Sequence, residues 1–375
     1  MKYINFNNAG SSFVKNQTLK IIKDFLEFEN KVGGYNAEIL YKKELDEFYL
    51  NTSNLINSNS NEISFLQNST YAWNFFLNSI SLKKNENVII LDNEYGSNLI
   101  GLINKKIKYK ICKIKKNGQI CLDDLKQKIN TKTRIVFICH IASQCGDVVN
   151  IEKVGNFLKK INKNIIFVVD ACQSIGQVKI DVKKQKCDIL VASGRKYLRG
   201  PRGTGILYIN SKIKKIISPF IYDIKNAYLK KNKIFVNKKN PIFEVFEYSP
   251  ALKLGLSNAI KYVNNKGIEK IEKNIKKLSS FFLSEMKSHD KICFYENPSL
   301  NIGINTFSIK GLDSRKVHNF LLKNKILTSI SNQQTSTEYF KKKNIKSVIR
   351  VSFHYYNKLE EVKKLIKCLI DLIQK

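Results

Sequence analysis

Two short apolar runs near the middle of the chain end on residues that can do chemistry. Ile165 to Val169 is followed by Asp170, and Ile189 to Ala192 is followed by the segment Ser193-Gly194-Arg195-Lys196. Short apolar runs without alternation are typical of strands buried on both faces of a sheet. Because ligands of open α/β sheets gather at the carboxyl ends of the strands, we expect Asp170 and Lys196 to lie together beside a ligand.

A carboxylate and a lysine placed in this way suit pyridoxal 5′-phosphate. The aldehyde of this cofactor forms a Schiff base with an amine, for which Lys196 is the candidate, and its ring nitrogen needs a carboxylate, for which Asp170 is the candidate. The alternative is an aspartate that caps a helix and a lysine on a hydrated loop. A nucleotide site in which Asp170 follows a Walker B strand fails, because the chain contains no GxxxxGK[ST] loop.

The same stretch resembles the signature of class V, fold-type I pyridoxal-phosphate enzymes. The resemblance rests on Asp170-Ala171-Cys172-Gln173, Gly176, Asp181, Asp188 and Ser193-Gly194-Arg195-Lys196. It covers nearly the whole chain and is most specific in this block. The family includes cysteine desulfurases, selenocysteine lyases, isopenicillin N epimerase-like proteins and ergothioneine-pathway C–S lyases. Residues 194–205 and 243–256 are most similar to the last two groups.

The resemblance implies further cofactor contacts. Ser69 and Thr70 precede a helical pattern, where free N–H groups and hydroxyls bind phosphate, although a plain helix cap would show the same residues. Ser193 and Arg195 resemble further phosphate ligands. Around the ring, the resemblance implies stacking by Tyr95 and places two side chains near the phenolic oxygen, Ser143 and Gln173.

Two more segments resemble the substrate-binding parts of the family. Arg350 matches the arginine that binds the substrate α-carboxylate, and only arginine presents a planar fork to such a group. Asn8 lies in an N-terminal strip that resembles the one closing over substrate. Arg199 and Arg202 flank a glycine turn, and the sequence leaves open whether they orient this loop or bind substrate.

The resemblance implies an amino-acid substrate, a homodimer, and Lys196 and Asp170 as catalytic residues, but it does not fix the reaction. A C–S β-lyase acting on a cysteine-derived amino acid is our first hypothesis, and an aminotransferase or amino-acid epimerase is the alternative. Cysteine desulfurases carry a sulfur-accepting cysteine on a loop of their small domain. The corresponding loop, residues 329–337, is polar and lacks cysteine, which disfavours a persulfide-forming desulfurase.

The composition is that of a globular protein of 375 residues, 43% of them hydrophobic. No apolar run approaches the ~18 residues of a membrane span, and the N-terminus lacks the apolar segment of a signal peptide, so we expect a cytoplasmic protein without a membrane partner. The net charge of +34 raises the alternative of a non-catalytic nucleic-acid-binding protein. Because the lysines are spread along the chain, nucleic acid is not the expected partner. The eight cysteines lack zinc-site spacing, so we expect free thiols and no metal.

Elements that could position these residues follow from the periodicity. Apolar runs alternate with amphipathic segments between residues 87 and 169, which predicts a mostly parallel sheet, seven-stranded by the family likeness, with helices on both faces. Residues 212–240 predict an irregular exposed excursion. We divide the chain into a cofactor-binding α/β domain, residues 1–250, and a linking helix with a smaller α+β domain, residues 251–375. The spacing of Asn357 and Glu360 predicts a capping box before the last helix.

Overall fold

The computed structural model describes residues 3–237, 243–295 and 302–374. Its centre is a seven-stranded sheet in which one strand, β8, runs antiparallel to its neighbours. In sheet order the strands are β2 (Ile63–Leu66), β8 (Gly205–Ile209), β7 (Ile189–Ser193), β6 (Ile166–Asp170), β5 (Thr133–Cys139), β3 (Asn87–Leu91) and β4 (Lys108–Cys112). The expected α/β fold with a mostly parallel seven-stranded sheet is confirmed.

Helices cover both faces of this sheet, as the unbroken apolar runs predict. Successive strand residues point to opposite faces, so that Phe167 and Val169 join one buried cluster while Ile166 and Val168 join another. The first cluster includes side chains of α3 (Lys42–Ile56), α6 (Leu122–Lys128), α7 (Ile151–Ile161), α9 (Pro250–Lys266) and α10 (Ile268–Met286). The second includes side chains of α4 (Ser69–Ser79), α5 (Gly96–Asn104) and α8 (Ser211–Lys214).

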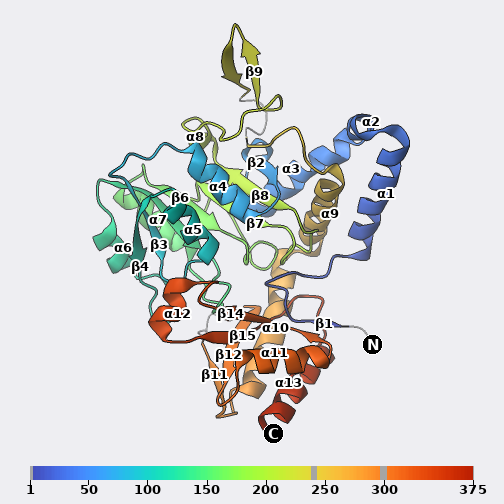
Figure 1. Cartoon of the computed structure of the whole chain (residues 1–375), viewed down its shortest axis with the longest axis vertical. Coiled ribbons are helices and arrows are strands. Elements are labelled where there is room, and N and C mark those ends of the chain that lie inside the picture. Colours follow the sequence, from blue (N-terminus) through green and yellow to red (C-terminus); the bar gives the residue numbers. More distant parts are fainter. Residues whose placement is uncertain (1–2, 238–242, 296–301, 375) are drawn as a thin grey trace.

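The remaining elements of the larger unit lie at its periphery. They are α1 (Asn16–Val32), α2 (Gly34–Leu40), the 3-10 turn η1 (Ser60–Glu62) and the paired strands β9 (Ala227–Lys230) and β10 (Lys233–Val236). The two strands form a hairpin that projects from the top of the molecule in Figure 1. The stretch expected to be irregular therefore contains a regular hairpin.

A second sheet forms the smaller unit at the bottom of Figure 1. It is antiparallel and has the order β11 (Ile292–Phe294), β12 (Ile304–Ile309), β15 (Ser347–Ser352) and β14 (Ser329–Asn332). Its other elements are α11 (Ser314–Lys323), β13 (Ile326–Leu327), α12 (Thr337–Lys343) and α13 (Leu359–Gln374). Phe307, Val351 and Leu369 belong to the core that this unit shares with α10.

The N-terminal strip belongs spatially to the smaller unit. The first strand, β1 (Ile4–Asn5), pairs in parallel with β13, and Asn7 forms a bridge with Ser352. The domain division at residue 250 stays a prediction, but residues 4–7 contribute to the unit that we expected to begin at residue 251. Within the described ranges, no helix is both long and apolar enough to cross a membrane.

Candidate active site

Three neighbouring strands, β5, β6 and β7, bring their carboxyl ends together at the predicted site. β6 ends at Asp170 and β7 at Ser193. Three residues after Ser193, Lys196 lies in a turn that is closed by two backbone hydrogen bonds: Gly200 N to Gly194 O (2.8 Å) and Arg199 N to Lys196 O (3.0 Å). Lys196 is half-buried and acts electrostatically on the thiol of Cys172, two residues after Asp170. The two predicted catalytic residues are thus brought together.

The Asp170 carboxylate is buried and held at both oxygens. Oδ1 accepts a hydrogen bond from the backbone N–H of Cys172 (2.9 Å), and Oδ2 accepts one from Nδ2 of Asn98 (2.9 Å). Each oxygen keeps a lone pair for a further donor. The carboxylate is therefore fixed in direction and can still receive a protonated ring nitrogen.

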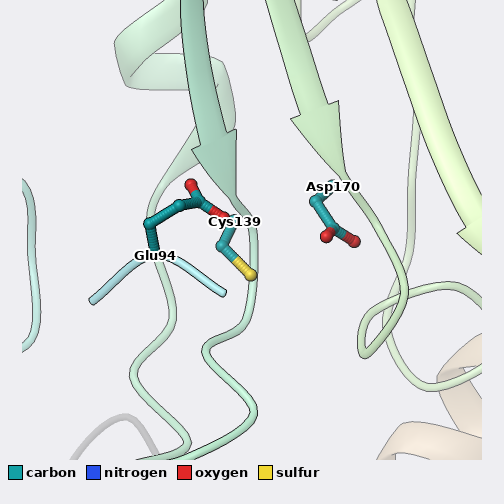
Figure 2. A group of neighbouring side chains, drawn as sticks. All are labelled: Glu94, Cys139 and Asp170. Carbon is teal, nitrogen blue, oxygen red and sulfur yellow. The ribbon is translucent and has the colours of Figure 1, made fainter. Parts of the chain in front are cut away.

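Two other ionisable groups, Glu94 and Cys139, lie beside Asp170 (Figure 2). One ligand atom of each of the three side chains lies within 4.8 Å of the others. Burial raises the pKa of Glu94 to about 8, and the charge of Asp170 adds to this shift. Burial also raises the pKa of the Cys139 thiol. Near neutral pH both groups are therefore mostly protonated beside the Asp170 carboxylate.

The start of α4 forms one wall of a cavity beside Lys196. Asn68 caps the helix by accepting a hydrogen bond from Tyr71 N (2.8 Å). The Ser193 hydroxyl accepts from Ser69 N (3.2 Å) and donates to Ser69 Oγ (3.0 Å). The cavity is lined by Gln67, Asn68, Ser69, Thr70, Tyr71, Asn74, Tyr95, Ser193, Arg195, Lys196, Arg202 and Gly203. A helix start with free hydroxyls and two arginines suits a phosphate group.

The other predicted ring contacts lie around this region. Tyr95 precedes α5 and is half-buried. The Ser143 hydroxyl donates to Gln144 Oε1 (3.3 Å), and Ser143 is buried. Gln173 donates from Nε2 to the carbonyl of Ala9 (3.0 Å), and its Oε1 has no partner in the described part of the chain.

Arg350 on β15 reaches the same region from the smaller unit. It donates to the carbonyl of Ser143 (3.0 Å) and to Asn7 Oδ1 (3.3 Å), while its buried Nε lacks an acceptor among the described residues. Burial lowers the pKa of Arg350 to about 10, and among its charged neighbours Tyr95 acts to raise this pKa and Arg195 to lower it. A buried guanidinium with an unused donor is suited to an anionic ligand.

Asn8, predicted to bind substrate, makes its hydrogen bonds within the protein. This side chain is fully buried, and its Nδ2 donates to the carbonyls of Asn5 and Ser352 and to Asn357 Oδ1. Its Oδ1 accepts from the Tyr356 hydroxyl. Since both ends of the amide are occupied, Asn8 has no free donor for a substrate and instead holds the strip together. Its neighbour Asn7 is the residue of the strip that contacts Arg350.

The two arginines with open roles differ in their surroundings. Arg199 donates to the carbonyl of Phe13 (2.8 Å) and to the Tyr355 hydroxyl (3.0 Å), and its guanidinium lies 4.3 Å from the centre of the Tyr356 ring. These contacts tie the lysine turn to both ends of the chain and support the loop-orienting alternative. Arg202 is exposed and lines the cavity mouth.

A polar segment of the smaller unit contacts the backbone on both sides of Tyr95. We call residues 332–336 the strap. Its Thr335 carbonyl accepts a hydrogen bond from Gly96 N (2.9 Å), and Ser336 Oγ donates to Glu94 O (2.7 Å). A Cβ atom on Gly96 would lie only 2.3 Å from the carbonyl oxygen of Gln334. The strap lies within the polar stretch of residues 329–337.

Sequence reasoning missed Glu94 and Asn98, and it named Asn7 only as a member of the N-terminal strip. Asn98 stands three residues after Tyr95, so it faces the strand ends once the helix starts there. A polar residue one turn into a helix that follows a buried strand was the available signal.

Comparisons with known proteins show the family and the fold of this chain. Residues 4–365 match the family described as Aminotransferase class-V. A probable cysteine desulfurase of Pyrococcus abyssi is 28% identical, covering 99% of this chain and 94% of that protein. The apo structure of a cysteine desulfurase from Thermococcus onnurineus NA1 superposes with a TM-score of 0.91 at 23% identity, covering 99% and 95% of the two chains. The cystine C–S lyase C-DES, in complex with its product cysteine persulfide, superposes with a TM-score of 0.88 at 19% identity, covering 98% and 97%.

The last two similarities are below 25% identity and bear on the fold alone. The family match spans nearly the whole chain, residues 4–365. This protein belongs to the aminotransferase class-V family of pyridoxal-phosphate-dependent enzymes.

Proposed function

We propose that this protein cleaves the C–S bond of cysteine or a cysteine-derived amino acid. The observation that carries the proposal is Arg350, whose buried guanidinium lies near Arg195 and Tyr95 of the cofactor cavity and keeps Nε unused. A substrate carboxylate is the acceptor that such a planar donor suits. The substrate is thus an amino acid held next to the cofactor.

The residues present fit pyridoxal phosphate. The start of α4, with Ser69 and Thr70, would hold the phosphate together with Ser193 and Arg195. When bound, the cofactor supplies an electron-accepting ring that stabilises negative charge at the Cα atom of an amino acid. Asp170 would keep the ring nitrogen protonated through its fixed carboxylate.

The remaining contacts would orient the ring. Tyr95 at the cavity wall would stack on one face. Ser143 and Gln173 would lie near the phenolic oxygen. The unpartnered Oε1 of Gln173 supports this role, because a buried amide oxygen without a donor is costly.

Lys196 would act as the amine that holds the cofactor and then as the general base. Its turn is closed by the Gly200 and Arg199 backbone hydrogen bonds, which keep the side chain at the cavity. Once a substrate amine has displaced it, Lys196 Nζ would accept the proton from Cα. With a leaving group on Cβ, loss of this proton is followed by cleavage of the Cβ–S bond.

The overall elimination balances without an oxidant. One water is consumed, and the Cα–H and Cβ–S bonds break. The products are pyruvate, ammonia and the released sulfur compound, which is hydrogen sulfide from cysteine, a thiol from an S-alkyl cysteine and a persulfide from cystine. Two observations support release of the sulfur into solution. The strap offers hydroxyls and amides in place of a thiol, and six of the eight cysteines are buried while Cys121 and Cys293 are half-buried away from the cavity lining.

The names of the relatives favour a second candidate, cysteine desulfuration. In that reaction cysteine and an acceptor thiol give alanine and a persulfide. Without a cysteine in the strap, the acceptor would be a small thiol. The two candidates share substrate class, cofactor and site, and differ in the carbon product.

We also propose a homodimer whose interface adjoins the site. Apolar side chains are exposed on α4 and α5: Tyr71 is 43%, Ile103 55% and Ile100 64% exposed. Tyr71 also lines the cofactor cavity. A group of exposed apolar residues of this kind marks an interaction surface, and a second copy would bury it at the cavity mouth.

The carbon product tests the proposal. Purified enzyme is incubated with cysteine, cystine and S-alkyl cysteines, and pyruvate, alanine and intact keto acids are quantified. Pyruvate with an equal amount of ammonia is expected. Alanine as the main product would establish desulfuration instead, and the intact keto acid would establish an aminotransferase. The Lys196→Ala variant is the control for background reaction.

A further inference from the structure

Asn98 lies between two carboxyl groups: that of Asp170, which contacts the cofactor in the proposed function, and that of Glu94, which does not. Its Nδ2 donates to Asp170 Oδ2 (2.9 Å) and to Glu94 Oε1 (2.9 Å), and the side chain is 3% exposed. An amide nitrogen carries two hydrogens, so one goes to each carboxyl. Both hydrogens of the Asn98 amide are therefore used in hydrogen bonds to the two carboxyl groups.

The backbone of Asn98 is held by a hydrogen bond from Trp73. The indole Nε1 donates to the Asn98 carbonyl (3.1 Å), and the fully buried Trp73 ring stacks on Phe137 of β5 at 4.1 Å and 13°. This packing sets α5 relative to the strand next to β6. The side chain of Asn98 is thereby aimed at the end of β6.

Glu94 fixes the amide from the other side. Its Oε1 also accepts from Tyr95 N (2.8 Å), while its buried Oε2 has no partner in the part of the chain that the structure describes. Figure 2 shows Glu94 and Asp170 on either side of Cys139. With Glu94 protonated, the group carries the single charge of Asp170, which matches the single charge of a protonated ring nitrogen.

We propose that Asn98 is a positioning residue: its amide, held by Glu94 and Trp73, fixes the Asp170 carboxylate where it meets the cofactor ring nitrogen. This inference rests on the proposed function. Asn98 does not touch the cofactor in this account and acts through Asp170. A residue that only fills space in the core would affect folding and cofactor binding independently of Asp170.

A double-mutant cycle separates the two roles. The dissociation constant of pyridoxal phosphate is measured from the fluorescence of Trp73, the single tryptophan of the chain. The proteins are wild type, Asn98→Ala, Asp170→Ala and the double variant. Asn104→Ala, an exposed asparagine on the same helix, is the matched control. We expect Asn98→Ala to weaken binding at least tenfold and to shift the visible absorbance band of the bound cofactor.

In the Asp170→Ala background the same substitution should change the dissociation constant less than twofold. An equal loss in both backgrounds would overturn the inference, as would wild-type affinity and absorbance in Asn98→Ala. If Asn98→Ala does not fold, Asn98→Leu, which fills a similar space without a donor, replaces it in the same cycle. Failure of the wild type to bind the cofactor would overturn the proposed function itself.

Discussion

Burial in the site disfavours the ionised form of Glu94. Its pKa is raised from 4.5 to about 8, first by burial. Between these two values the unfolded chain has lost a proton that the folded protein keeps, so the free energy of unfolding falls as pH rises through this window. One such group lowers the free energy of unfolding by up to ~1.4 kcal/mol for each pH unit of this window.

Glu94→Gln should therefore remove part of the loss of stability toward alkaline pH. Glutamine resembles the protonated carboxyl and cannot ionise. Both proteins are compared without cofactor. We expect the melting temperature of the variant minus that of wild type to increase steadily from pH 5 to pH 8. Glu27→Gln, at an exposed position of α1, serves as control. A difference between variant and wild type that is independent of pH would contradict this account.

The sequence predicted the residues that stand directly at strand ends, because a buried apolar run marks where a strand stops. Asp170, Ser193 and Lys196 are of this kind. The roles of Asn98 and Asn7 were missed because they depend on how a helix or strip turns relative to the sheet. Asn8 was chosen over Asn7 because the sequence does not show which of two adjacent amides faces inward.

At the scale of elements, the strap joins the smaller unit to the segments that follow β3 and β5. Gln144 Nε2 donates to both Ser336 Oγ (3.2 Å) and Asn93 O (2.7 Å), in addition to the contacts at Gly96. These bonds join β3, β5 and the smaller unit. The strap is thus held in place by polar contacts that its sequence, NQQTS, supplies.

Gly96→Ala should displace the strap, since the new methyl group would lie 2.3 Å from a backbone oxygen. Overpacking of this kind costs about 1–3 kcal/mol. We expect a lower free energy of unfolding in urea and a raised KM for the amino-acid substrate. Gly34→Ala is the matched control, because Gly34 also begins a helix but meets only a flexible side-chain oxygen at 3.4 Å. Equal behaviour of the two variants would show that the strap does not depend on Gly96.

Element types followed from periodicity, whereas details that depend on tertiary contacts did not. The last helix was expected to pair Asn357 with Glu360, but Asn357 Nδ2 and Lys358 N both donate to Glu361. The hairpin β9–β10 was not expected, because its exposed lysines and apolar residues lack the alternation of a half-buried strand. Its turn residues, Lys231 and Asn232, have positive φ, which suits a tight hairpin.

At the scale of the whole molecule, we propose that a second copy of the chain covers the exposed apolar residues on α4 and α5. We expect sedimentation to show a homodimer. Ile100→Asp combined with Ile103→Asp should dissociate it and weaken cofactor retention, because the interface would border the cavity. Leu322→Asp is the control: Leu322 is 40% exposed on α11 in the smaller unit. A fully active monomeric wild type would contradict the proposal.

The most direct test of the account asks which residue binds the cofactor covalently. The protein loaded with pyridoxal phosphate is reduced with borohydride, digested and mapped by mass spectrometry, with Lys196→Ala treated in parallel. Lysines form the Schiff base that borohydride reduces, and the chain carries 59 of them, so chance labelling would be widely spread. The account predicts one stoichiometric pyridoxyl group, on the peptide that contains Lys196, and none in the variant. A stoichiometric label on another lysine, or an unchanged label in Lys196→Ala, would contradict it.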